Sequence, residues 1–243
     1  MRVKAFMLAC ALATGAMASE IPVQMPVSIQ VPDTFYHRPP VKKRCFTSKA
    51  VEKQIKDMHS KLVEVSPKLW QMFQNSFPNT LDTTVFPDGD RTFVITGDID
   101  AMWLRDSGAQ VWTYINYIQD DPELAKLIHG VILQQFEFIC LDPYANAFLN
   151  DPTKESHWAT DYPTRKKGVH ERKYEIDSLC YPLRLAYQYW LLTGDDSIFG
   201  ELWQNALDKI LALFREQQRK NGTKTSYKFQ RKTHVLHDTY SNY

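Results

Sequence analysis

Apolar residues recur at helical spacing along most of this chain, and that period limits the fold more than any other feature. The first two stripes contain Val51, Ile55, Met58, Leu62 and Val65, then Leu69, Met72 and Phe73. Steps of three and four residues place such positions on one face of an α-helix. Signals for β-strands are few, and the best is the sequence TFVIT at residues 92–96. The pattern predicts an all-α chain of about six helices.

Local signals predict where several helices begin and end. Ser66-Pro67 and Asp121-Pro122 each give an N-cap residue followed by proline at the first helical position. Ser107 and Gln110 fit a capping box, which predicts a helix that begins at Ser107. Gly194 predicts a helix end, because glycine readily adopts the left-handed conformation found there.

The first 18 residues are predicted to be a secretory signal peptide. Arg2 and Lys4 form a basic start, residues 5–13 are mostly apolar, and Ala16-Met17-Ala18 fits a cleavage site. The apolar stretch is too short to span a bilayer. A frayed N-terminal helix is the alternative. The signal peptide predicts an exported protein, periplasmic or secreted, with no membrane span.

Composition narrows the partners of the remaining chain. The full 243-residue sequence has 29 basic and 28 acidic residues, a near balance that gives no sign of a nucleic-acid or anionic-membrane partner. Residues 19–46 contain five prolines and are predicted to form an extended leader on the domain surface. Without residues 1–18 the cysteines are Cys45, Cys140 and Cys180. They are too few and too widely spaced for a disulfide framework, and we expect buried free thiols.

Two long polar segments interrupt the helical pattern, Asn75–Asp106 and Asp142–Tyr174. Both are rich in Trp, Asp, His and Arg. Long loops without periodicity are usually functional or disordered, and the aromatic content argues against disorder. We therefore expect the functional residues in these two segments.

The first segment ends in a dense cluster, Thr96–Ser107, just before a predicted helix. Arg105 beside Asp106 can donate two parallel hydrogen bonds to vicinal hydroxyls or hold a carboxylate. Trp103 offers a flat apolar face to the C–H side of a sugar ring. Asp106 would lie where the helix dipole favours negative charge. The alternative is a capped helix with a structural Asp–Arg pair, and these residues alone leave both interpretations open.

The second segment ends in His170–Asp177, which is charged at nearly every position and leads directly into an apolar stripe. Charge runs of this kind are usually solvated surface. From the residues alone, the interpretation as ordinary surface is favoured, with Asp177 as a cap or surface residue.

No metal or cofactor is predicted. His234–Asp238 contains two histidines and an aspartate but lacks the HExxH pattern and a nearby cysteine. Asp98-Ile99-Asp100 lacks the glycine and final glutamate of a calcium loop. The sequence contains no Gly-rich phosphate loop and no GxSxG motif, so nucleotide-binding and serine-hydrolase functions have no support.

The two clusters resemble motifs of glycoside hydrolase family 125, the exo-acting α-1,6-mannosidases. Thr96–Ser107 is similar to a motif of the form TGDIxAMWLRDS, and Glu171–Pro182 is similar to ERKYEIDSLCYP. Shorter matches lie at residues 79–84, 161–162 and 229–233. The resemblance runs from about His37 to the last residue.

The resemblance implies an (α/α)6 toroid of paired helices, of which residues 47–243 would form the N-terminal part. It implies metal-independent hydrolysis with inversion at the anomeric carbon of a mannose-containing oligosaccharide, such as an N-glycan or mannan. By motif, the terminal mannose would contact Asp98, Trp103, Arg105 and Asp106. The second cluster would add His170, Lys173 and Glu175.

The resemblance places neither catalytic carboxylate within these 243 residues. Family members are nearly twice as long, with the general acid in a later Asp-rich motif and the base glutamate later still. We therefore expect an N-terminal part of a catalytic domain that binds substrate but lacks the acid–base pair. A non-catalytic mannoside-binding remnant and another six-hairpin glycosidase, such as a glucosidase, are the alternatives.

Overall fold

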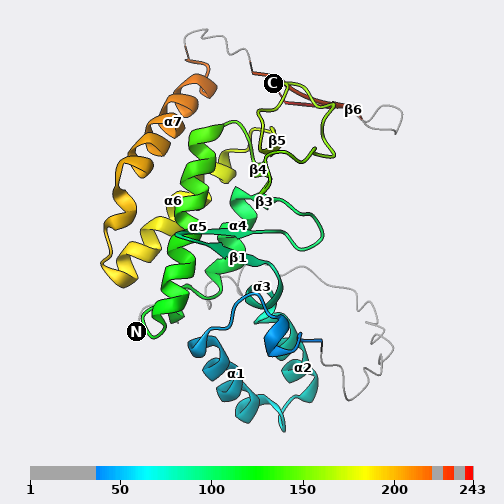
Figure 1. Ribbon diagram of the computed structural model, residues 1–243, viewed down its shortest axis with the longest axis vertical. Helices are drawn as coiled ribbons and strands as arrows, with labels where there is room; N and C mark the ends of the chain where they lie inside the picture. The colour runs from blue at the N-terminus through cyan, green and yellow to red at the C-terminus, as the bar shows by residue number, and fades with distance from the viewer. Residues whose placement is uncertain (1–36, 221–226, 233–238, 243) are drawn as a thin grey trace, which may run out of the picture. The chain divides into compact units, whose positions relative to one another are not determined.

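The computed structural model describes residues 37–220, 227–232 and 239–242, which belong to one compact unit, Phe35–Tyr243. Within them the helices are α1 (Lys49–Leu62), α2 (Pro67–Ser76), α3 (Asn79–Thr83), α4 (Leu104–Trp112), α5 (Pro122–Leu141), α6 (Ile176–Thr193) and α7 (Glu201–Gln217) (Figure 1). The strands are β1 (Val85–Asp88), β2 (Arg91–Val94), β3 (Met102–Trp103), β4 (Ala147–Phe148), β5 (Val169–Glu171), β6 (Phe229–Lys232) and β7 (Thr239–Asn242). Short 3-10 turns occupy Val41–Lys43, Ile115–Tyr117 and Ser197–Phe199.

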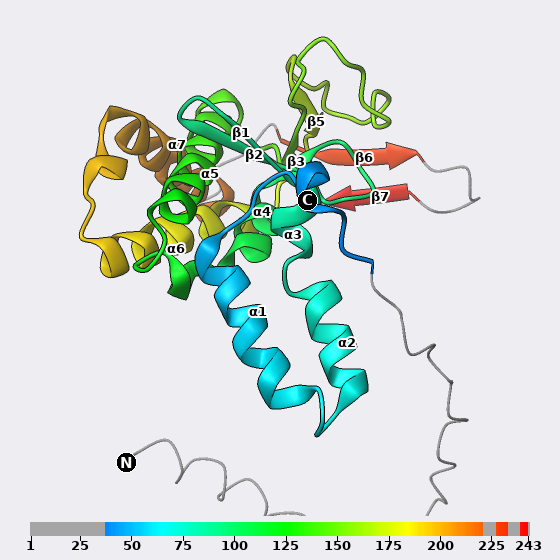
Figure 2. The same cartoon turned by 60° about the horizontal axis from the view of Figure 1, so that its bottom comes forward.

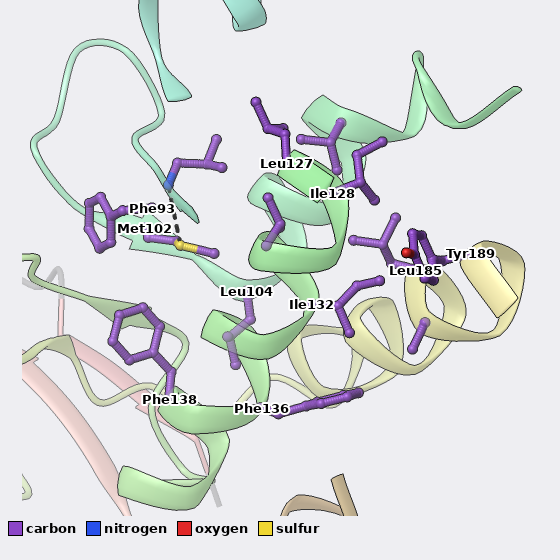
Figure 3. Close-up of a cluster of buried hydrophobic side chains, with 14 of the residues drawn as sticks. Phe93, Met102, Leu104, Leu127, Ile128, Ile132, Phe136, Phe138, Leu185 and Tyr189 are labelled. Atoms are coloured by element: carbon purple, nitrogen blue, oxygen red, sulfur yellow. Dashed lines mark hydrogen bonds between the residues drawn. The ribbon is translucent and has the colours of Figure 1, made fainter. Parts of the chain in front are cut away.

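Helix α5 forms the centre of the core. Its start follows the predicted signal, because the Asp121 side chain accepts a hydrogen bond from the Leu124 amide (3.1 Å) and Pro122 opens the helix. In Figure 3, Ile128 and Ile132 of α5 face Leu185 and Tyr189 of α6, whereas Phe93 of β2 and Met102 of β3 lie on the other side of α5. Burying each such side chain contributes roughly 1.5–3 kcal/mol.

One glycine lets a strand approach this helix closely. A Cβ atom at Gly130 would lie 2.6 Å from Thr92 Oγ1 and 3.0 Å from the Arg91 backbone, so β2 could not pack there on a larger residue. Among the described residues α5 is also the one helix long and apolar enough to cross a membrane. Burial in the core accounts for that composition.

The helices fall into two groups in Figure 2. Helices α1 and α2 lie side by side as a hairpin that extends away from α6 and α7. The start of α1 stays against the start of α5, because the Ala50 amide donates to Asp121 Oδ2 (3.2 Å). Val51 and Ile55 of α1 are buried as predicted, whereas α2 has no fully buried residue. The fold is therefore mostly helical, as the apolar stripes predict.

The two polar segments are more structured than predicted. The first holds α3, β1, β2 and β3, and the second holds β4 and β5. All of these pairings are antiparallel: β1 with β2, β3 with β4, and β4 with β5. The strand signal at residues 92–96 is confirmed by β2, which covers Thr92–Val94 of it. The other strands are too short to produce a periodic signal, which is why the sequence predicts loops there.

The predicted capping box is wrong. Helix α4 begins at Leu104, three residues early, and Ser107 is a buried residue of its first turn whose hydroxyl donates to Leu104 O (3.3 Å). Gln110 donates to Ile95 O (3.0 Å), a tertiary contact. The prediction at Gly194 is confirmed, because α6 ends there with a φ of 70°.

Part of the predicted leader is visible. Residues 37–46 are tied to the domain by Arg38 and Arg44, which both pair with the buried carboxylate of Asp82 on α3. Residues 1–18 and 19–36 lie outside the described part. Cys45, Cys140 and Cys180 are free within the described residues, but the prediction that they are buried is wrong, because Cys45 and Cys140 are half-buried and Cys180 is exposed.

Candidate sugar-binding site

A small sheet brings the two sequence clusters together. Strand β3, which carries Trp103, pairs with β4, and β4 pairs with β5, which carries His170 (Figure 1). The Leu104 amide also donates to Asn146 O (3.0 Å), which fixes the start of α4 against the residue before β4. The ends of both polar segments therefore lie side by side at the start of α4 and α6.

Arg105 forms the centre of an ionic cluster. Its guanidinium lies 3.1 Å from Glu175 Oε2, 3.2 Å from Asp177 Oδ2 and 3.2 Å from Asp106 Oδ2. Lys173 joins through Glu175, at 3.2 Å. Two cations thus face three carboxylates in this cluster, and the Arg105 and Asp106 side chains are each 35% exposed.

The cluster keeps Arg105 charged. Burial opposes the charged form, but the hydrogen bond to Asp177 and the charges of Asp106 and Glu175 raise the pKa of Arg105 above its ordinary value. A charged guanidinium and an ammonium can donate to hydroxyl oxygens, and the carboxylates can accept from hydroxyl groups. The cluster is therefore suited to a polyhydroxylated ligand.

Trp103 and His170 form the apolar side of the site. Their ring centroids lie 5.3 Å apart in an edge-to-face arrangement, and the ring of His157 lies 6.0 Å from that of His170. His170 is 2% exposed, and neither ring nitrogen has a hydrogen-bond partner among the described residues. Burial lowers the pKa of His170 below its ordinary 6.5, so the ring is neutral near pH 7. A neutral imidazole offers one donor and one acceptor.

Among the described residues, Asp98 makes no hydrogen bond or ion pair with these groups. It is exposed in the loop between β2 and β3, and within the described residues its hydrogen bond comes from the Thr96 hydroxyl (3.3 Å). Six of the seven predicted residues are therefore brought into two neighbouring groups, and Asp98 is not. Their contacts with sugar stay predictions.

Two further polar residues belong to the site but were not predicted as such. Asp177, expected as a cap or surface residue, contacts Arg105 and is 46% exposed. Asn146 is 1% exposed, and its Oδ1 accepts from the Lys173 amide (3.2 Å). The acidic first turn of a helix is a weak signal for Asp177, whereas nothing in the sequence near Asn146 indicates its contacts.

No metal centre emerges from the part of the chain that the structure covers, because no group of three or more His, Cys, Asp or Glu side chains there could hold an ion. His234–Asp238 lies outside that part.

A helical fold that gathers carboxylates, basic groups and an indole at one partly exposed surface fits the glycoside hydrolases. Comparison with protein families agrees, because the model of the metal-independent α-mannosidases of glycoside hydrolase family 125 matches residues 66–243. The chain belongs to this family.

Two relatives extend the comparison. The meiotically up-regulated gene 157 protein of Schizosaccharomyces pombe is 40% identical over 196 residues, which cover 75% of this chain and 38% of that protein. A metal-independent α-mannosidase of Streptococcus pneumoniae, solved as a non-productive complex with α-1,6-mannobiose, is 38% identical with a TM-score of 0.71. That match covers 79% of this chain and 44% of the other. This chain therefore spans less than half the length of either relative.

Proposed function

We propose that this chain forms the mannose-binding part of an exported enzyme that removes terminal α-1,6-linked mannose with inversion. The observation that carries the proposal is the partly exposed Arg105 cluster beside Trp103 and His170. Family membership and the mannobiose complex of the bacterial relative support it. The proposal includes an (α/α)6 toroid to which α1–α7 contribute, and export directed by residues 1–18.

The side chains suggest a division of work on the sugar. The indole of Trp103 would cover the C–H face of the ring, where its apolar surface excludes water. Arg105 and Lys173 would donate to hydroxyl oxygens while Asp106 and Glu175 accept from hydroxyl groups. Because these charges already contact one another, they would meet the sugar in a fixed arrangement.

The carboxylates around Arg105 suit binding better than acid catalysis. An inverting glycosidase needs a carboxylic acid that holds its proton and a carboxylate that activates water, roughly 6.5–9.5 Å apart. Asp106 and Glu175 instead both pair with the Arg105 guanidinium, at 3.2 Å and 3.1 Å. We therefore assign Asp106 and Glu175 to binding, and place the acid–base pair in residues that this sequence does not contain.

The test compares the 243-residue chain with a version extended by the coding region that follows codon 243. Each is titrated with α-1,6-mannobiose by calorimetry and assayed for mannose release in EDTA. We expect both to bind the disaccharide and only the extended version to cleave it, releasing β-mannose first. A folded extended protein that neither binds nor cleaves mannobiose would contradict the proposal, and turnover by the shorter chain would contradict the placement of the acid–base pair.

A matched pair of variants locates the binding. Arg105→Gln should abolish binding in both versions. Arg91→Gln is the control, because Arg91 also contacts two carboxylates, Asp90 at 2.7 Å and Glu137 at 3.0 Å, but lies outside the site. Binding without turnover in the extended version would favour a mannoside-binding protein, and cleavage of glucosides would favour another six-hairpin glycosidase.

A further inference from the structure

Arg231 on β6 is held between two buried carboxylates. Its Nε and Nη2 lie 3.0 Å and 2.5 Å from the two oxygens of Asp161, and Nη2 also lies 2.5 Å from Glu171 Oε1. The guanidinium stacks on Trp158 at 3.5 Å. The side chains of Arg231, Asp161 and Glu171 are only 16%, 2% and 8% exposed. Glu171 follows His170 in the chain, but neither carboxylate hydrogen-bonds to a proposed sugar contact among the described residues, so the function proposed above does not explain this cluster.

Glu171 connects this arginine to Asn146. The side-chain amide of Asn146 donates to Glu171 Oε2 (2.5 Å), and the Asn146 backbone amide donates to Glu171 O (3.2 Å). Asn146 is buried and its position is fixed at both its backbone and its side chain. A displacement of the Glu171 carboxylate would therefore be felt at Asn146.

Asn146 in turn contacts both segments that carry the proposed sugar contacts, the one around Leu104 and the one around Lys173. Its Oδ1 accepts from the Lys173 amide (3.2 Å), and its backbone oxygen accepts from the Leu104 amide (3.0 Å). Leu104 lies between Trp103 and Arg105 in the chain, and Lys173 pairs with Glu175. One continuous path of hydrogen bonds thus runs from Arg231 to the backbone that carries the sugar contacts.

The segment before β5 is also attached to β6, the strand that carries Arg231. Tyr162 and Gln230 of β6 exchange two backbone hydrogen bonds of 2.9 Å. The same segment is attached to β5 itself, because the Ser156 hydroxyl donates to His170 O (2.6 Å). Two buried carboxylates face one guanidinium here, so loss of Arg231 would leave negative charge uncompensated and favour movement of Glu171 toward water.

We propose that Arg231 is a positioning residue for mannoside binding, which acts through Glu171 and Asn146 to fix the backbone at Leu104 and Lys173. The inference rests on the proposed function, because it takes the mannoside as the ligand. Arg231 itself contacts no sugar in this proposal.

The test substitutes Arg231 in the 243-residue chain and follows two measurements. The first is hydrogen exchange at the amides of Leu104, Asn146 and Lys173, and the second is calorimetric affinity for α-1,6-mannobiose. We expect Arg231→Gln to speed exchange at these amides and raise Kd roughly tenfold, within the range that residues remote from a ligand reach. Arg231→Lys should restore part of both, because an ammonium keeps the charge but loses the forked geometry.

Arg38→Gln is the matched control. Arg38 is 5% exposed and also lies between two carboxylates, Asp82 and Glu52, but at the opposite end of the described chain. It should lower stability while leaving Kd and the three amides unchanged. An equal rise of Kd in Arg38→Gln would show a general effect of lost stability and would overturn the proposal.

The remaining outcomes separate this inference from the proposed function. Unchanged exchange at the three amides in Arg231→Gln would overturn the inference whether or not the chain binds sugar. If the unsubstituted folded chain fails to bind mannobiose, the proposed function fails in this chain, while the exchange data still decide whether the path exists. Should Arg231→Gln not fold, Glu171→Gln tests the same path, because it removes the charge and keeps the side-chain size.

Discussion

Arg231 and Arg105 each face more than one carboxylate, and burial separates their roles. Arg231 is 16% exposed, between Asp161 and Glu171 in the interior. Arg105 is 35% exposed, among three carboxylates at the ends of α4 and α6. The comparison teaches that the same ion-pair chemistry can fix a backbone in one place and remain available to a ligand in another.

The two clusters differ because water reaches the charges around Arg105 but not those around Arg231. Around Arg105, water can replace a lost partner and screen the remaining charges, so ion pairs there contribute little to stability. Around Arg231, water is excluded, and a lost partner leaves an uncompensated buried charge. The buried cluster should therefore dominate stability and the exposed cluster should dominate recognition.

The largest expected effect is the loss of stability in Arg231→Met. It removes the cation and leaves both Asp161 and Glu171 buried without a charge partner. Breaking a buried ion pair in this way costs about 3–5 kcal/mol. Urea unfolding followed by circular dichroism measures the change, and a loss below about 1 kcal/mol would show that the cluster behaves like the exposed one.

A second effect comes from the uncharged side of the site, where burial lowers the pKa of His170. As the pH falls below 6.5, the His170 side chain takes up a proton in the unfolded chain before it does so in the folded protein. The contribution of neutral His170 to the free energy of unfolding is therefore fully present above pH 6.5 and is lost as the pH falls toward the lower folded-state pKa. The charged groups near the ring are Glu171, which opposes the shift, and His157, Arg165 and Arg231, which add to it.

The measurement is the free energy of unfolding between pH 5 and pH 7, an interval of about two units around the ordinary histidine pKa. His170→Gln should flatten this dependence, since a neutral amide takes up no proton. His157→Gln should retain most of it, because burial, the largest cause of the lowered His170 pKa, is unchanged in that variant. An unchanged slope in His170→Gln would mean that His170 accepts its proton equally well in both states.

The sequence predicts the helices well where packing agrees with periodicity. Val51 and Ile55 are buried as the stripe requires, but Val65, assigned to the same stripe, is 82% exposed because α1 ends at Leu62. Leu69 and Met72 keep the helical period of α2 and still remain 49% and 59% exposed. Periodicity predicts which face of a helix is apolar, whereas the neighbours that cover it depend on the tertiary fold.

The site is predictable in its members more than in its geometry. Arg105 and Glu175 are 70 residues apart in the sequence, and their contact depends on pairing between strands of two or three residues. Such strands leave no periodic signal, so the resemblance to known motifs supplied the residues and not their contacts. The same limit hides Asn146 and the connection from Arg231, which are tertiary throughout.

A smaller change of stability is expected when the exposed cluster loses its own cation. Arg105→Met should alter the free energy of unfolding by less than about 1 kcal/mol, because partly exposed ion pairs are weak. The same variant should bind α-1,6-mannobiose too weakly to measure under the proposed function. Urea unfolding tests the predicted stability and calorimetry tests the predicted loss of binding, each with Arg231→Met measured in parallel as the reference. A loss of several kcal/mol in the free energy of unfolding of Arg105→Met would remove the contrast between the two clusters.

The smallest effect should come from a single carboxylate of the exposed cluster. Asp106 lies in the first turn of α4, where the helix dipole favours negative charge by about 0.3–1 kcal/mol at low salt. Asp106→Asn should lower stability by that amount, and added salt should reduce the difference because it screens exposed charges. Asp177→Asn is the matched variant, since Asp177 occupies the first turn of α6 and also pairs with Arg105.

Each of these substitutions also relieves repulsion among the three carboxylates of the cluster. The summed stability loss of Asp106→Asn and Asp177→Asn should therefore stay far below that of Arg231→Met. If Asp106→Asn, Asp177→Asn and Arg231→Met lost the same free energy of unfolding, burial would not separate the two clusters.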